Sequence, residues 1–134
     1  MSSYMVLSHT GVHAMFATHD VATPPSLSKM QEIVGGYIAP AFTLPSPMGK
    51  GREITGYVND EGLCMNLPQF IIMTGIGGYQ GLAGNMLILG LSKTGKTVTL
   101  HPDEVSFMMK RIRIITLADG TQTFVVLLPQ EDEY

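Results

Sequence analysis

Charged residues are scarce in this sequence, and their scarcity limits the class of protein. Only 14% of the 134 residues are charged and 45% are hydrophobic, whereas soluble proteins carry roughly 25% charged residues on average. This balance excludes a disordered chain and a charge-rich coiled coil. Because few charges remain to cover the exterior, we expect a second copy of the chain to cover part of an apolar surface. The length predicts a single domain over residues 1–134.

The few charges that exist are unevenly placed. Glu131, Asp132 and Glu133 lie in an acidic tail, residues 130–134, and account for the whole net charge of −3. The rest of the chain is therefore neutral overall. General nucleic-acid binding needs a basic face and imitation of DNA needs an acidic face, so neither is expected.

Cysteine and long apolar runs are also nearly absent. Cys64 is the single cysteine, which excludes an intramolecular disulfide and a CxxC metal site. Free cysteine is among the most buried residue types, so we expect Cys64 to be an ordinary buried strand residue. No apolar run reaches the roughly 18 residues of a membrane-spanning helix. The first basic residue is Lys29, so no signal peptide is expected and the expected location is the cytoplasm.

Capping residues predict two short helices. Ser26 precedes apolar residues spaced three and four apart, and a Gly-Gly pair follows them, which predicts a helix over residues 26–34. Pro102 and the two acids after it predict the start of a second helix, because proline is favoured at the first helical position and acids in the first turn. Residues 1–23, which contain three histidines, are expected to form short strands or irregular chain.

Apolar runs separated by turn residues predict strands that pair mainly as hairpins. The result is an α+β domain with one mostly antiparallel sheet of about six strands and with both helices on one face. Proline and glycine mark residues 40–52 as a loop, and five glycines mark residues 75–84 as a mobile loop. The main expected strands are residues 54–59, 63–65, 85–91, 96–100, 112–117 and 121–128.

Residues 90–97 match the phosphate-binding pattern G-x-x-x-x-G-K-[ST] of a P-loop. A working P-loop would use Lys96 for phosphate and Thr97 for Mg²⁺ at the start of a helix. The β-branched residues after Lys96, and then Pro102, disfavour a helix at that point. We therefore favour a β-hairpin with its tip at residues 93–95, and keep nucleotide hydrolysis by Lys96 and Thr97 as an alternative.

Four segments of the chain carry a family resemblance, in the order that the family has them. They are MQEIVGGYI (30–38), ITGYVNDEGLCMNLP (54–68), LAGNMLILG (82–90) and TLHPDEV (99–105). Over about residues 27–105 the chain thus resembles the small phage, plasmid and bacterial proteins called domain of unknown function 3846. The resemblance implies a small α+β fold and a mobile-element setting, so that a phage-encoded chain would act in the cytoplasm of its host. It implies no activity and no catalytic residues.

Histidines are the candidates for metal binding. His9, His13 and His19 could hold a metal only if the fold or a subunit interface brought them together, because Gly11 and Val12 disfavour the helix on which residues four apart share a face. The spacing of a zinc site is absent. We therefore predict no metal site and no cofactor, and leave assembly of the histidines across an interface open.

Lys110, Arg111 and Arg113 form the densest basic cluster in the sequence. If a strand has begun there, Arg111 and Arg113 project from the same face, and two guanidinium groups suit a phosphate or carboxylate ligand. The competing interpretation is that these charges complement the dipole of the preceding helix and the acidic tail.

We interpret the chain as a non-enzymatic binding protein that forms homo-oligomers. It would capture a small anionic, nucleotide-like ligand and thereby counter host defence. An alternative hypothesis is a protein–protein inhibitor of a host factor, which predicts an exposed apolar patch or an open sheet edge. The residues expected to bind the ligand are Arg111 and Arg113 for phosphate, Gly84 and Asn85 for backbone and amide contacts, and Tyr37 and Tyr79 for stacking on a base.

Overall fold

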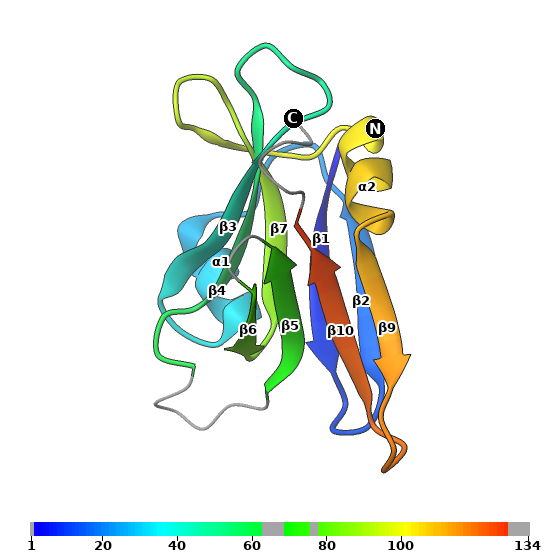
Figure 1. The fold of residues 1–134 in the computed structure, drawn as a ribbon. Helices are drawn as coiled ribbons and strands as arrows, with labels where there is room; N and C mark the ends of the chain where they lie inside the picture. Colours follow the sequence, from blue (N-terminus) through cyan, green and yellow to red (C-terminus); the bar gives the residue numbers. More distant parts are fainter. Residues whose placement is uncertain (1, 63–68, 76–77, 129–134) are drawn as a thin grey trace.

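The computed structural model describes residues 2–62, 69–75 and 78–128. Within these residues the chain forms two helices and ten strands in two sheets, which confirms the predicted α+β class and the six-stranded, mainly antiparallel sheet. The predictions for Cys64 and the acidic tail lie outside the described residues, and so does the side chain of Tyr79. Figure 1 shows a helix, a large sheet and a small sheet arranged as successive layers.

The large sheet is antiparallel throughout and has the order β2-β1-β7-β4-β3, with β8 paired to the end of β7. The central strand, β7, is the charge-free run that was predicted as a buried strand, and five of its six residues are buried. The bounds of the strands are β1 (Ser3–His9), β2 (Ala14–Asp20), β3 (Ile38–Pro45), β4 (Glu53–Asn59), β7 (Met86–Leu91) and β8 (Thr97–Val98).

The small sheet was not anticipated from the sequence. Its four strands have the order β6-β5-β10-β9, and β5 and β10 run parallel, with Ile71 opposite Phe124. The other two pairs, β5·β6 and β9·β10, are antiparallel hairpins. The bounds are β5 (Gln69–Gly75), β6 (Gly78–Ala83), β9 (Ile112–Thr116) and β10 (Gln122–Leu127).

The hydrophobic core lies between the two sheets. Alternate residues along a strand point to opposite faces, so each strand contributes every second side chain to this core. The largest fully buried apolar side chains of this layer are Met5, Leu7, Ile54, Ile71, Met86, Ile88, Leu100, Met108 and Phe124.

Helix α1 (Leu27–Val34) covers the outer face of the large sheet. The Ser26 hydroxyl accepts the N–H of Lys29 at its start, and Gly35 ends it with a φ of 84°, so both predicted capping residues are confirmed. A second cluster holds it against the sheet and consists of Tyr4, Met30, Val34, Leu87 and Leu89.

Helix α2 (Pro102–Met109) begins as the sequence predicts, with Pro102 in its first turn and His101 as the N-cap. It does not share a face with α1. Met108 belongs to the core between the sheets, whereas α1 packs on the outer face of the large sheet. The prediction that both helices lie on one face is therefore wrong. The small sheet, which was not predicted, covers the other face of the large sheet, and α2 packs on the core between the two sheets.

Two predicted loops are largely strands. Pro40 and Pro45 lie in β3, the edge strand of the large sheet, where the missing N–H of proline need not break a ladder, and a register shift follows Pro40. The loop is thus only residues 46–52. In the glycine-rich segment, residues 78–83 form β6 and pair with β5, because backbone hydrogen bonds need no side chain.

Candidate functional site

The P-loop match forms a β-hairpin. Ser92 donates its N–H to the Lys96 carbonyl at 2.8 Å, and Gly95 takes a φ of 85° in the turn between β7 and β8. Thr97 then enters β8, and the next helix starts only at Pro102. The helix N-terminus that would hold a phosphate next to Lys96 is therefore missing, and the predicted hairpin is confirmed.

Arg111 and Arg113 lie where α2 passes into β9. The Arg111 guanidinium stacks on the Phe107 ring, 4.4 Å from its centroid, and its Nε is buried without a hydrogen-bond partner among the described residues. The exposed Arg113 donates from Nη1 to the carbonyls of Lys110 at 2.6 Å and Ile112 at 3.3 Å. No described carboxylate pairs with either arginine.

Gly84 and Asn85 lie in the turn between β6 and β7, against the end of α1. The Asn85 side-chain amide donates to the carbonyl of Ile33 at 3.0 Å, and the amide of Asn59 donates to the carbonyl of Val34 at 3.3 Å. Both asparagines thus satisfy carbonyls at the end of α1, which have no partner within the helix. Gly84 adopts a φ of 85° at the turn into β7.

The remaining predicted site residues are separated as well. Tyr37 follows α1 and is 70% exposed, and Tyr79 lies in β6 of the small sheet. The structure therefore groups Gly84 with Asn85 and Arg111 with Arg113, on different sheets, and does not unite the six residues in one site.

The three N-terminal histidines make separate contacts. His9 Nε2 bonds to the Gln122 carbonyl at 2.8 Å, the His19 ring stacks on Tyr4, and His13 lies at the turn before β2. Across residues 2–62, 69–75 and 78–128, no three metal-binding side chains converge.

A basic region that the sequence analysis missed lies at one end of the molecule, where two loops meet (Figure 1). Lys50 belongs to the β3–β4 loop, residues 46–52, and Lys93 to the turn between β7 and β8. A Cβ on Gly51 would lie 3.0 Å from Lys93 Cγ, so the glycine permits the lysine stem to pack on the loop. Neither lysine forms an ion pair within the described part of the chain.

Lys50 has a strained backbone. Its φ of 59° makes it the one described non-glycine residue in the left-handed region, and it lies between Gly49 and Gly51, whose φ values are 68° and 76°. Such a conformation costs an ordinary residue about 1 kcal/mol or more and persists only where the surroundings hold it.

Glu104 anchors this loop to α2. The fully buried carboxylate accepts hydrogen bonds from the Ser46 hydroxyl at 2.6 Å, from Arg52 at 2.7 and 3.2 Å, and from the His101 N–H at 2.8 Å. Burial alone would raise the pKa of Glu104, but the hydrogen bonds from Arg52, His101 and Ser46 outweigh it and hold the pKa below the usual 4.5. Glu104 is therefore ionised at neutral pH.

Above this anchor lies a cavity of about 280 Å³, here called the loop pocket. Arg52 donates to Glu104 and to the Thr99 carbonyl, but no bond from its Nη1 is found among the described residues. Lys50 contributes an ammonium group, and no carboxylate lines the cavity. The lining residues are Ser2, Met48, Lys50, Arg52, Thr99 and His101.

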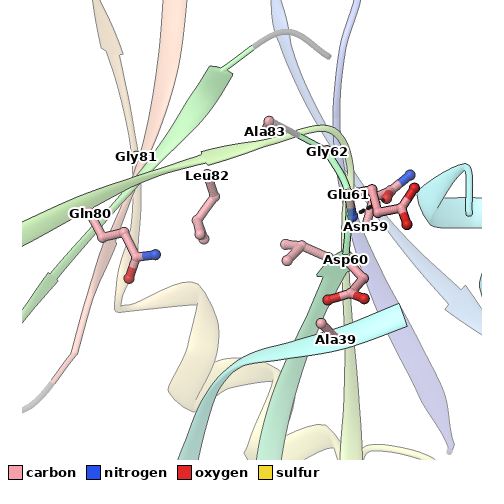
Figure 2. A pocket seen from close by; sticks show the side chains of 10 residues that line it. Ala39, Asn59, Asp60, Glu61, Gly62, Gln80, Gly81, Leu82 and Ala83 are labelled. Carbon is pink, nitrogen blue, oxygen red and sulfur yellow. Dashed lines mark hydrogen bonds between the residues drawn. The ribbon is translucent and has the colours of Figure 1, made fainter. Parts of the chain in front are cut away.

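The other described cavities differ in charge. Figure 2 shows the turn pocket, a cavity of about 270 Å³ between β6 and the turn after β4, into which Gln80, Leu82 and Asp60 point. Glu61 also belongs to its lining. Two further cavities beside α1 are lined by Glu32. Unlike these three cavities, the loop pocket has no carboxylate in its lining.

The sequence offered one weak signal for the loop pocket. A lysine between two glycines is typical of a turn with positive φ values, but nothing local indicates that the loop of Lys50 and the turn of Lys93 lie together. Their proximity follows from the pairing of β4 with β7, which places the two loops at the same end of the large sheet.

Neither helix in the described part of the chain is long and apolar enough to cross a membrane. The family model for a domain of unknown function (DUF3846) matches residues 11–113. Because this match covers most of the chain, the protein belongs to that family, as the resemblance implied. The comparisons with curated proteins and with solved structures give no match.

Proposed function

We propose that this member of the DUF3846 family is a non-enzymatic binding protein for a small anionic ligand, and that the ligand binds in the loop pocket. The observation that carries the proposal is the lining of this cavity, which contains Lys50 and Arg52 and no carboxylate. An anion placed there would meet the Lys50 ammonium and the Arg52 guanidinium, whose other side is already paired with the buried Glu104 carboxylate behind the wall.

The donors suit a phosphate group. Lys50 supplies three N–H donors at the cavity, and Arg52 keeps Nη1 for a ligand while Glu104 holds the rest of its guanidinium in place. His101 accepts the N–H of Asp103 at Nδ1, so the neutral tautomer with that bond has its N–H at Nε2, which is a further donor. Hydrogen bonds between charged groups are about twice as strong as neutral ones.

The size of the loop pocket narrows the ligand class. Sites for drug-sized ligands measure roughly 300 to 1,000 Å³, so a cavity of about 280 Å³ fits a phosphate with part of its sugar rather than a whole dinucleotide. A phosphate monoester, such as a nucleoside monophosphate with its base outside the cavity, is the expected class.

The arginine pair at the α2–β9 junction is the competing location. Arg111 has a buried Nε without a partner among the described residues, which favours a ligand there, but neither Arg111 nor Arg113 lines any of the four cavities described above. Cation–π stacking on Phe107 gives Arg111 a structural role without a ligand.

Isothermal titration with inorganic phosphate and with adenosine monophosphate tests the proposal. We expect Lys50→Gly to weaken binding roughly tenfold or more, because a hydrogen bond to a charged group contributes about 1.5 to 3 kcal/mol. Glycine is chosen because it accepts the φ of 59°, so the free energy of unfolding should change by less than about 1 kcal/mol.

Two controls locate the site. Lys29→Ala removes a lysine from the exposed surface of α1 and should leave binding unchanged. Arg111→Ala should also leave it unchanged, and loss of binding in that variant alone would move the ligand to the arginine pair. If neither phosphate nor adenosine monophosphate binds the unchanged protein, the proposal is wrong.

A further inference from the structure

The turn pocket has a lining opposite in charge to that of the loop pocket. Asp60 and Glu61 contribute carboxylates to it, and its lining contains no lysine, arginine or histidine. The two cavities lie at opposite ends of β4, because the loop pocket is beside the residues before Glu53 and the turn pocket is beside the residues after Asn59. The turn pocket is thus separate from the proposed phosphate site.

Two polar side chains point into this cavity. Figure 2 shows the Asp60 carboxylate and the Gln80 amide facing the space between β6 and the turn after β4. Within the described residues, neither side chain forms an ion pair or a hydrogen bond. Gln80 shares a face of β6 with the buried Leu82, since alternate residues of a strand point the same way. Both polar side chains are exposed, so a ligand can reach them.

Much of the remaining wall is apolar. Val58 and Leu82 belong to the core between the sheets and are 9% and 7% exposed. Ala39 lies opposite Val58 in the pairing of β3 with β4 and also lines the cavity. A hydrocarbon chain placed against this wall would bury apolar surface, which is favourable.

The turn that carries Asp60 is held in place by contacts of its own. The Asp60 N–H donates to the Tyr37 carbonyl at 2.8 Å. Glycine at position 62 lets the turn approach β6, because a Cβ on Gly62 would lie 2.9 Å from the Ala83 carbonyl oxygen. The backbone at Asp60 is therefore ordered before a ligand binds, which lowers the entropic cost of binding.

A bare metal ion suits this lining poorly. Calcium and magnesium surround themselves with several oxygen ligands, whereas no three histidine, cysteine or acidic side chains converge in the described part of the chain. A primary ammonium group has three N–H donors and needs fewer acceptors. The Asp60 carboxylate and the side-chain carbonyl of Gln80 are acceptors of this kind.

We propose that the turn pocket binds the primary ammonium end of a short aliphatic chain. The ammonium group bonds to Asp60 and Gln80, and the hydrocarbon chain packs against Val58 and Leu82. The cavity of about 270 Å³ is slightly smaller than the roughly 300 to 1,000 Å³ of sites for drug-sized ligands, so it fits a short chain. A free alkylamine and the side chain of a lysine share this chemistry.

Titration of the isotope-labelled whole chain with butylammonium chloride, followed by NMR spectroscopy, tests the proposal. We expect saturable shifts of the amide signals of Asp60 and Leu82 with a millimolar dissociation constant, because so small a ligand makes few contacts. Ammonium chloride lacks the chain and 1-butanol lacks the charge, so each should bind at least about tenfold more weakly. Lysine with both backbone ends blocked distinguishes the two sources: tighter binding than butylammonium assigns the site to a lysine side chain, and weaker binding to a free amine.

Charge variants of the lining test the chemistry. Asp60→Asn keeps the shape and should weaken butylammonium binding roughly tenfold or more, whereas Gln80→Glu adds a carboxylate and should strengthen it. Both side chains are exposed, so the variants should fold like the unchanged protein. Asp20→Asn is the matched control, because it removes an exposed carboxylate at the end of β2 and should leave binding unchanged.

Three results overturn the proposal. The first is the absence of saturable shifts in the unchanged protein. The second is an equal affinity for 1-butanol, which would remove the role of the charge. The third is butylammonium binding that Asp60→Asn leaves unchanged, because the ammonium group would then lie elsewhere.

Discussion

At the level of single residues, the buried carboxylate of Glu104 determines the shape of the β3–β4 loop. It accepts hydrogen bonds from Ser46 and Arg52 of the loop and from His101 at the start of α2. Removal of one partner of a buried ion pair leaves the other charge uncompensated, which is far costlier than loss of an exposed pair. Glu104 is thus a structural residue that holds the base of the loop pocket.

We expect Glu104→Gln to lower the free energy of unfolding by about 3 kcal/mol, the lower end of the range for buried pairs, because the Arg52 side chain remains 26% exposed. Urea denaturation at neutral pH measures it. Glu32→Gln is the matched control, since its pair with Lys29 is exposed and should contribute about 0.5 kcal/mol or less.

The pH dependence of the free energy of unfolding gives a second test of the role of Glu104. Its pKa is lowered in the folded protein, so its ionisation stabilises the fold above the unfolded pKa. This stabilisation is lost as the pH falls from 4.5 through the lower, folded pKa. The Glu104→Gln variant should lack that part of the acid destabilisation. Equal acid sensitivity in both proteins would contradict the assigned role.

At the level of elements, α1 is held at its end by side chains from two strand turns. Asn59 and Asn85 donate to the carbonyls of Val34 and Ile33, which the helix itself leaves unsatisfied. Asn85 was predicted as a ligand contact, which stays a prediction, and one N–H of its amide makes this bond to α1. The docking of α1 on the large sheet therefore depends on the turn before β7.

Asn85→Asp distinguishes a role of Asn85 in holding the end of α1 from a role in contacting a ligand. The substitution keeps the shape, removes the donor to Ile33 and puts a negative charge beside the end of α1, so we expect a loss of about 1 to 3 kcal/mol in the free energy of unfolding. Thermal and urea denaturation measure it. A residue that only contacted a ligand would leave stability unchanged while binding fell.

At the level of the whole molecule, Gln122 ties the two sheets together. Its side chain accepts the N–H of Ala14 in β2, and its backbone carbonyl accepts a bond from His9 of β1. These contacts join the β1–β2 hairpin of the large sheet to β10 of the small sheet. The sandwich is thereby closed at one corner by hydrogen bonds as well as by its core.

Hydrogen exchange tests this closure. Gln122→Ala should speed exchange of the Ala14 amide roughly tenfold, because its acceptor is gone. The Val21 amide, which donates to the Ser2 carbonyl at the other end of β2, is the internal control and should keep its protection. Unchanged protection at Ala14 would show that Gln122 does not hold the corner.

Local signals predicted the parts of the fold that depend on neighbours in sequence. Ser26 and Gly35 bound α1, Pro102 starts α2, and Gly120 turns β9 into β10 with a φ of 89°. The small sheet depends on Ile71 lying opposite Phe124, a pairing of distant segments that no local pattern encodes. The loop pocket was missed for the same reason, because its lining residues come from segments that only strand pairing brings together.

The parallel pairing of β5 with β10 also affects the order of events while the chain is being synthesised. A ribosome makes β5 and β6 well before β10, so this hairpin leaves the exit tunnel without the strand that covers its edge. Until β10 follows, Ile71 has no Phe124 to pack against, and the edge of β5 is open to strands of neighbouring nascent chains. A pause in translation between the two strands would lengthen this interval and favour misassembly.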